Sequence, residues 1–90
     1  SPTFALSHHY PTGSMHLIHM DLYRIESSLS ARELFIEEEE ELEINNGILI
    51  IEWPELIEPL LETFWKIEIS YAFEDGRNLN IYEPKSSKNL

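Results

Sequence analysis

The sequence contains no cysteine in its 90 residues. This absence excludes disulfide bonds, thiolate nucleophiles and cysteine-ligated zinc, and it fits a reducing compartment. Long apolar runs are absent too. No run reaches the roughly eighteen residues that a membrane-spanning helix needs, and no signal-peptide pattern is visible. We therefore expect a cytoplasmic location and no membrane partner.

Positive charge is scarce, with six lysines and arginines against 17 acidic residues and a formal net charge of −11. Affinity for a polyphosphate comes mainly from cationic side chains, which release counterions from it. The composition therefore disfavours unaided binding to nucleic acid or to anionic lipid. We expect no DNA partner, and any RNA would have to be held by another protein.

Glycine is also scarce, which bears on nucleotide binding. The phosphate-binding loop G-x-x-x-x-G-K-[ST] does not occur, because the three glycines, Gly13, Gly47 and Gly76, are widely separated. The chain opens on Ser1 rather than Met, and we interpret it as a piece of a longer protein. Because 42% of the residues are apolar, we predict one packed domain over residues 1–83 and a polar, disordered tail over residues 84–90.

Two apolar runs of strand length each end in an acidic residue. Residues 15–20 are followed by Asp21, and residues 48–51 are followed by Glu52. In open α/β sheets, ligands bind beyond the carboxyl ends of the strands, where a carboxylate can hold Mg²⁺ directly or through its waters. The pattern indicates a nucleotide–metal site formed by both acids. The alternative is that each acid only caps the following turn.

Three segments, in this order, closely resemble the TsaE (YjeE) family. They are Ser1-Pro2-Thr3-Phe4-Ala5-Leu6, His19-Met20-Asp21-Leu22-Tyr23-Arg24 and Ile51-Glu52-Trp53-Pro54-Glu55. That family is the P-loop ATPase component of the bacterial machinery that makes threonylcarbamoyladenosine at position 37 of tRNA. The resemblance covers the whole chain but only the C-terminal part of a family member. It implies an α/β fold with a mixed parallel and antiparallel sheet and flanking helices, like the C-terminal part of a P-loop NTPase.

The resemblance also implies roles for four residues. Glu52 would bind or organise Mg²⁺, and Asp21 would orient or activate the attacking water. Thr3 would contact the phosphates or the metal, and Trp53 would flank the nucleotide. An ordinary Ser-Pro turn remains the alternative for Thr3, and a place in the core remains the alternative for Trp53.

The cofactors implied by the resemblance are ATP and Mg²⁺, both only together with the missing P-loop part. The implied partners are TsaD and TsaB proteins, and tRNA is reached only indirectly through their complex. Two other classes stay open: a non-enzymatic, acidic protein-interaction module, and an inactive fragment. A P-loop motif encoded upstream of Ser1 would favour the ATPase, whereas a genuine start immediately before Ser1 would favour the module.

One long helix is expected in the middle of the chain. It should begin near Ala31, with Ser28 or Ser30 as its cap, and end at residues 45–47. Five acids in succession, residues 37–41, indicate a solvated helix surface, or alternatively a docking site for a basic partner. A partial apolar face should be supplied by Leu29, Leu34, Phe35, Leu42 and Ile44.

The remaining pattern predicts strands and turns. A turn over residues 10–14 should join two antiparallel strands. Four consecutive aliphatics at residues 48–51 predict a central strand that is buried on both faces. A short helix is expected over residues 54–61. A hairpin over residues 64–82, with its turn at residues 74–76, should complete one side of the sheet.

The histidines and one arginine invite functional interpretations. His8 and His9 are adjacent in an extended chain, and His16 and His19 are separated by an odd number, so within each pair the side chains point to opposite faces. We therefore expect no zinc site among them. Arg24 is a candidate phosphate clamp, with a structural ion pair to a nearby acid as the alternative.

Overall fold

The computed structural model describes residues 7–84, which include most of two compact units of the chain. The first unit comprises residues 1–60 and the second comprises residues 61–90. The expected opening segment, with Thr3, and the tail beyond residue 84 lie outside the described residues, and the single domain over residues 1–83 stays a prediction. Within the described residues, no helix combines the length and the apolar character needed to cross a membrane.

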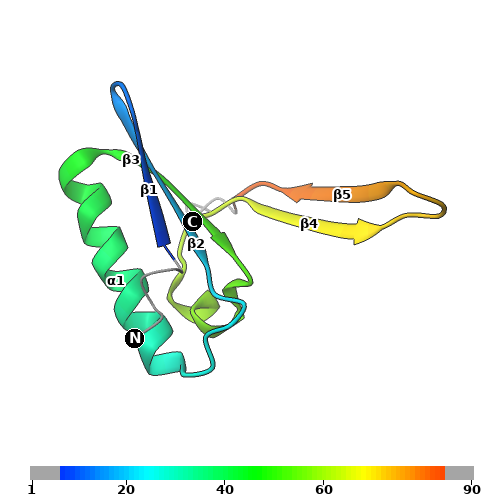
Figure 1. Ribbon diagram of the computed structural model, residues 1–90, viewed down its shortest axis with the longest axis horizontal. Coiled ribbons are helices and arrows are strands. Elements are labelled where there is room, and N and C mark those ends of the chain that lie inside the picture. The colour runs from blue at the N-terminus through cyan, green and yellow to red at the C-terminus, as the bar shows by residue number, and fades with distance from the viewer. Residues whose placement is uncertain (1–6, 85–90) are drawn as a thin grey trace, which may run out of the picture. The chain divides into compact units, whose positions relative to one another are not determined.

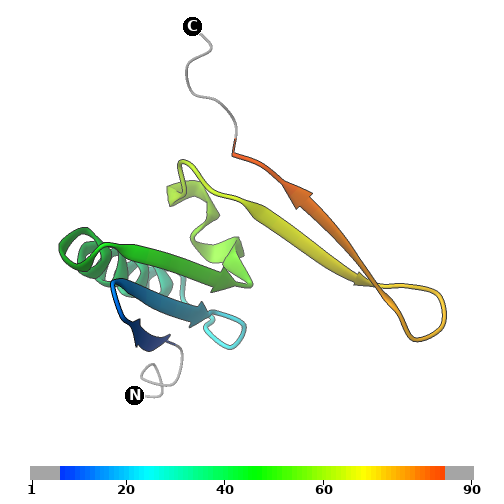
Figure 2. The same ribbon diagram turned by 90° about the horizontal axis from the view of Figure 1, so that it is seen from above.

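The first unit is a mixed three-stranded sheet with one α-helix (Figures 1 and 2). The strands β1 (Ser7–Thr12), β2 (Met15–Asp21) and β3 (Gly47–Glu52) lie in the order β1-β2-β3. β1 pairs antiparallel with β2, and β2 pairs parallel with β3. Parallel neighbours need a crossover connection, which here contains the helix α1 (Ser28–Asn45). The predicted α/β class with a mixed sheet is confirmed.

The core lies between one face of the sheet and α1. Ile18 and Met20, two residues apart on β2, are fully buried, because residues at this spacing share one face of a strand. From α1, Ala31 and Phe35 are buried at a spacing of one helical turn. Of the apolar helix face expected from the sequence, only Phe35 is buried, and Leu29 and Ile44 are exposed.

The helix begins one turn earlier than predicted. Its N-cap is Ser27, whose side-chain oxygen accepts a hydrogen bond from the backbone N–H of Ser30 at 3.2 Å. The expected caps, Ser28 and Ser30, are therefore wrong, because several serines occur in succession and the first of them reaches a free helical N–H. The predicted helix end is confirmed: α1 stops at Asn45, and Asn46 has a positive φ of 58°.

Two expectations about the strands of this unit are corrected. β1 extends through Thr12, and the loop to β2 contains only Gly13 and Ser14, since Thr12 pairs with Met15. Pro11 is tolerated inside β1 because an edge strand does not need every backbone N–H. β3 is an edge strand of the described sheet rather than its centre. Its residues Ile48 and Ile50 are about half exposed, because α1 covers only the opposite face.

The expected helix over residues 54–61 is replaced by two short 3₁₀ turns, η2 (Pro54–Leu56) and η3 (Glu58–Leu60). Pro59 explains the interruption, because proline lacks an N–H and restricts the residue before it away from the helical conformation. Between the two turns, Ile57 is fully buried and anchors this segment.

The second unit is a β-hairpin. Its strands, β4 (Lys66–Tyr71) and β5 (Arg77–Tyr82), pair antiparallel, and the chain turns at residues 74–75 as predicted. The two strands form a sheet of their own, so the expectation that the hairpin completes the larger sheet is wrong. Every residue of both strands is exposed, because a two-stranded ribbon by itself cannot bury a face.

Candidate functional site

The two predicted strand-end acids lie opposite each other. Asp21 is the last residue of β2, Glu52 is the last residue of β3, and the two are register partners in the parallel pair. Neighbouring strands are about 4.8 Å apart, so both carboxylates leave the sheet at one rim. Their positions along the strands place them on the face that α1 does not cover, because Ile18, Met20 and Leu22, at the alternate positions, are buried.

Glu52 is held by a histidine. Nε2 of His19 lies 2.5 Å from Oε2 of Glu52, and the side chain of Glu52 is half exposed. A carboxylate can only accept, so this ring nitrogen donates. His19 lies diagonally across the strand pair, since its own register partner is Ile50. The contact engages one carboxylate oxygen of Glu52, Oε2.

Asp21 does what the capping alternative expects. Its Oδ1 accepts a hydrogen bond from the backbone N–H of Tyr23 at 3.1 Å, an arrangement that stabilises the turn after β2. The backbone N–H of Leu22 donates to the carbonyl oxygen of Glu52 at 3.1 Å, which ties the two strand ends together. Capping uses one oxygen of Asp21. Within residues 7–84 the second oxygen accepts no hydrogen bond from the protein.

Trp53 follows Glu52 in an unusual backbone conformation. Its φ of 58° and ψ of 60° lie in the left-handed region, where a bulky side chain is a genuine outlier. Its ring packs against Tyr23, with centroids 4.9 Å apart, and 53% of the residue is exposed. Trp53 therefore does not lie in the core. Strained backbone of this kind costs about 1–3 kcal/mol and tends to occur at functional sites.

The other sequence-based candidates divide into those outside the described residues and those without a partner in them. Thr3 lies outside the described part of the chain. Arg24 is exposed, and no ion pair found within residues 7–84 involves it, so the structural ion-pair alternative finds no support there.

The donor chemistry of the rim fits a magnesium ion. Mg²⁺ takes oxygen ligands and is typically held by one or two carboxylates while it keeps several waters. Asp21 and Glu52 offer two carboxylates from adjacent strands, on an open face of the sheet. These residues could hold the ion directly or through its waters.

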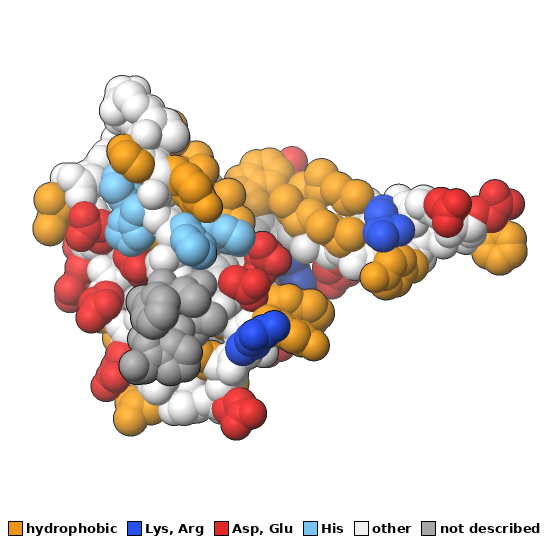
Figure 3. All heavy atoms as spheres, viewed as in Figure 1, with side chains coloured by type: hydrophobic (Ala, Val, Ile, Leu, Met, Phe, Trp, Pro, Cys, Tyr) orange, Lys and Arg blue, Asp and Glu red, His pale blue; other side chains and the backbone are white. Residues whose placement is uncertain are grey.

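The structure also brings together residues that the sequence pattern did not connect. His9 on β1 and His16 on β2 make a ring-to-ring hydrogen bond beside acidic residues of α1. Figure 3 shows histidine side chains gathered next to acidic ones on this part of the surface. Adjacent side chains alternate between the two faces of each strand, as predicted. That alternation does not show that His9 and His16, on different strands, are diagonal neighbours across the antiparallel pair. Pairing β1 with β2 around the Gly13 turn would have found them.

The first unit is therefore of the α/β class, with a mixed sheet and two acids at the carboxyl ends of adjacent parallel strands. The family model described as "Threonylcarbamoyl adenosine biosynthesis protein TsaE" matches residues 1–79. The chain therefore belongs to the TsaE family. The matched residues include Asp21 and Glu52, the two acids of the rim.

Individual relatives agree with the family match. A protein of Rickettsia felis named "tRNA threonylcarbamoyladenosine biosynthesis protein TsaE" is 41% identical over 91 residues, which cover 100% of this chain and 51% of the relative. A protein of the same name from a Nostoc species is 37% identical, covering 90% of this chain and 50% of the relative. A third, from Rickettsia bellii, is 35% identical, covering 90% and 54%. The chain thus spans about half the length of the curated relatives it matches.

Proposed function

We propose that this chain is the C-terminal part of an ATP-binding and ATP-hydrolysing subunit that serves threonylcarbamoylation of adenosine 37 in tRNA. Family membership supports the pathway, since the relatives are named for tRNA threonylcarbamoyladenosine biosynthesis. The observation that carries the hydrolytic role is the register of β2 and β3, which places Asp21 opposite Glu52 at the carboxyl rim of a parallel strand pair. This rim is where α/β sheets bind their ligands.

Each residue of the rim has a distinct task in this proposal. Glu52, oriented by His19, holds Mg²⁺, and Asp21 uses its free oxygen to orient the attacking water. Trp53 flanks the nucleotide from the exposed side, and Thr3 contacts the phosphates. When bound, the metal ion neutralises charge on the phosphates. Catalysis of phosphoryl transfer consists mostly of such positioning and charge stabilisation.

The subunit works with other proteins. A net charge of −11 disfavours direct binding of tRNA by this chain. We infer that TsaD- and TsaB-type partners hold the tRNA, in the cytoplasm, and that ATP turnover is coupled to their cycle. The 90 residues contain no phosphate-binding loop motif, so we expect no specific ATP hydrolysis by this chain on its own.

The test is turnover in a protein that carries these residues together with a phosphate-binding loop. Asp21→Asn and Glu52→Gln should each slow ATP hydrolysis by roughly 10²-fold or more, because a misplaced water or metal forfeits on the order of 3 kcal/mol of transition-state stabilisation. The thermal midpoint should change little, since exposed carboxylates contribute little to stability. Glu58→Gln, an exposed acid of η3, is the matched control and should leave turnover unchanged.

The opposite pattern would contradict the proposal. If both acids only cap turns, Asp21→Asn should leave hydrolysis nearly intact, and Asp21→Ala, which removes the acceptor for the N–H of Tyr23, should cost about 1 kcal/mol of stability. Turnover by the unfused 90-residue chain that depends on Mg²⁺ and disappears in Glu52→Gln would contradict the expectation that the loop is required.

A non-enzymatic protein-interaction role is the second candidate, and the β4–β5 hairpin favours it. Cross-strand partners Ile67 and Ile81, and Ile69 and Leu79, place four aliphatic side chains on an exposed ribbon. Exposed apolar patches of this kind are typical of binding surfaces. If the hairpin is a protein-binding surface, replacing Ile69 and Leu79 with Ser should abolish association with a partner protein. The same change should leave ATP turnover unchanged in a protein that also carries the phosphate-binding loop.

A further inference from the structure

The face of the sheet that α1 covers carries two histidines in direct contact. His9 pairs with Ile18 and His16 pairs with Pro11, so the two histidines are diagonal neighbours on the face that also carries buried Ile18. Nδ1 of His9 lies 3.0 Å from Nε2 of His16, and the rings meet edge to face at 76°. One nitrogen of each ring thus faces a nitrogen of the other ring.

A buried carboxylate orients the first of these rings. Glu38, the single charged residue that is buried among residues 7–84, accepts a hydrogen bond from Nε2 of His9 at 2.9 Å, and its other oxygen accepts one from the hydroxyl of Ser7. Because a carboxylate only accepts, the proton of the neutral His9 ring is on Nε2, and the lone pair is on Nδ1, the atom that faces His16. Histidines that ligate metals are oriented by a carboxylate in this way.

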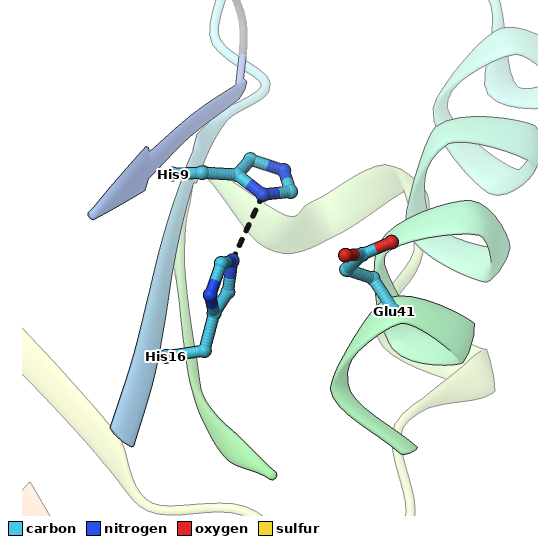
Figure 4. A group of neighbouring side chains, drawn as sticks. All are labelled: His9, His16 and Glu41. Atoms are coloured by element: carbon cyan, nitrogen blue, oxygen red, sulfur yellow. Dashed lines mark hydrogen bonds between the residues drawn. The ribbon is translucent and has the colours of Figure 1, made fainter. Parts of the chain in front are cut away.

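A third donor comes from the next turn of α1. A carboxylate oxygen of Glu41 and one nitrogen of each histidine all lie within 4.8 Å of one another. Figure 4 shows the Glu41 carboxylate facing the two rings from the helix. The side-chain amide of Asn45 donates to Oε2 of Glu41 at 2.8 Å and so holds the carboxylate in place. Two imidazoles and one carboxylate are a donor set that suits zinc.

We propose that His9, His16 and Glu41 bind a divalent transition-metal ion of the zinc type, with Glu38 orienting His9. In a tetrahedral zinc site the two ligating nitrogens are about 3.3 Å apart, so the observed 3.0 Å needs an opening of only a few tenths of an ångström. The proton that Nε2 of His16 donates to His9 moves to Nδ1 of the His16 ring when the ion binds, which frees the Nε2 lone pair. The Glu41 oxygen lies within 4.8 Å of both nitrogens, so a small adjustment of its side chain brings it to the ion. A surface hollow of about 140 Å³ is lined in part by His16 and Asn45. The fourth position is taken by water.

This site is independent of the proposed function. It lies on the opposite face of the sheet from Asp21 and Glu52, because its histidines are on the face that α1 covers. Its ligands also differ in kind, since it offers two imidazoles, whereas the rim offers two carboxylates suited to magnesium and one imidazole, His19, that is already bonded to Glu52. Either site can therefore fail its test without affecting the other.

The experiment is calorimetric titration of the 90-residue chain with Zn²⁺ in excess Mg²⁺, which competes for the carboxylates of the rim. We expect one Zn²⁺ per chain. Replacing an orienting carboxylate typically weakens metal binding by about 10- to 100-fold. Glu38→Gln should show a loss in that range, and His9→Gln, His16→Gln and Glu41→Gln should each lose at least as much. His8→Gln, His19→Gln and Glu40→Gln are matched controls, each close in sequence to the site but outside it, and should bind Zn²⁺ as the parent chain does.

A second measurement needs no variant and covers the case in which a substitution unfolds the chain. On addition of Zn²⁺, the ring ¹⁵N resonances of His9 Nδ1 and His16 Nε2 should shift, while those of His8 and His19 should stay in place. Equal loss of binding in the controls, shifts confined to His19, or no saturable binding at millimolar Zn²⁺ would overturn the proposal.

Discussion

On each face of the three-stranded sheet a histidine contacts a glutamate, and the two glutamates differ in their exposure to solvent. On the covered face, His9 contacts Glu38 at 2.9 Å, and the Glu38 side chain is 10% exposed. On the open face, His19 contacts Glu52 at 2.5 Å, and the Glu52 side chain is 50% exposed. The shorter contact is the more hydrated one, so its length is a poor guide to its contribution to stability.

Burial decides what each pair does. Glu38 is buried between α1 and the sheet and has little contact with water. The hydrogen bonds from His9 and Ser7 replace that water and offset the free-energy cost of burying the carboxylate. Glu52 keeps water and can exchange its partner for a ligand without a large penalty. The covered pair holds the His9 ring in place, whereas the open pair stays accessible to solvent.

The most severe way to break this arrangement is to separate β2 from β3, on which both faces depend. A Cβ at Gly47 would lie 1.8 Å from the backbone oxygen of His16, so Gly47→Ala forces the strands apart. We expect it to destabilise the fold by about 3 kcal/mol or more. Chemical denaturation measures the loss.

Gly13→Ala is the control for this substitution. Gly13 has a positive φ of 68° but open space around its Cβ position, so the cost should be only the roughly 1–2 kcal/mol of a left-handed conformation. Equal losses for the two glycine variants would show that the close approach at Gly47 has no consequence.

The comparison between the two pairs is sharpened by removing each carboxylate. Glu38→Ala should lower the free energy of unfolding by about 2 kcal/mol, because Nε2 of His9 and the hydroxyl of Ser7 each lose a hydrogen bond that typically contributes about 0.5–1.5 kcal/mol. Glu52→Ala should change it by less than about 0.5 kcal/mol. Denaturant titration of both variants measures the difference, and a larger loss for Glu52→Ala would reverse the assignment of roles.

A smaller effect is expected at α1, the helix that covers one of the two faces. Ser27→Ala removes the side-chain acceptor for the N–H of Ser30 and should cost about 1 kcal/mol. Ser30→Ala leaves that acceptor and the donor N–H in place and should be close to neutral. Thermal midpoints of the two serine variants decide which serine is the cap.

The smallest effect concerns the open face alone. Tyr23 and Trp53 stack beside the rim, and aromatic pairs contribute about 0.5–1.5 kcal/mol beyond their buried area. Because Trp53 is half exposed, a double-mutant cycle with Tyr23→Ala and Trp53→Ala should give a coupling energy near the lower end, about 0.5 kcal/mol. A coupling of zero would mean that the left-handed backbone, rather than the stacking, sets the position of Trp53.

Local signals in the sequence predicted what depends on neighbouring residues. The apolar runs that end at Asp21 and Glu52 gave strand ends at the right residues, and Asn46 gave the helix end. A glycine turn and a hairpin turn likewise depend on residues close in the chain.

What could not be predicted depends on partners distant in the chain. Four aliphatics at residues 48–51 read the same whether one face or two faces are covered, and only the placement of α1 shows that Ile48 and Ile50 are half exposed. Glu38 looked like one member of a solvated run, since nothing in the sequence shows that β1 brings His9 beside it. The contact between His9 and His16 required the pairing register of two strands.

β2 contributes residues to both proposed sites, alternately along the strand. His16 and Ile18 face α1, and His19 and Asp21 are at the positions that the helix does not cover. A shift of one residue along this strand would exchange the two sets, moving the carboxylate of Asp21 under the helix and Met20 out to water. Insertion or deletion of a single residue within β2 would therefore invert the chemistry of both surfaces at once, while most substitutions would alter only one.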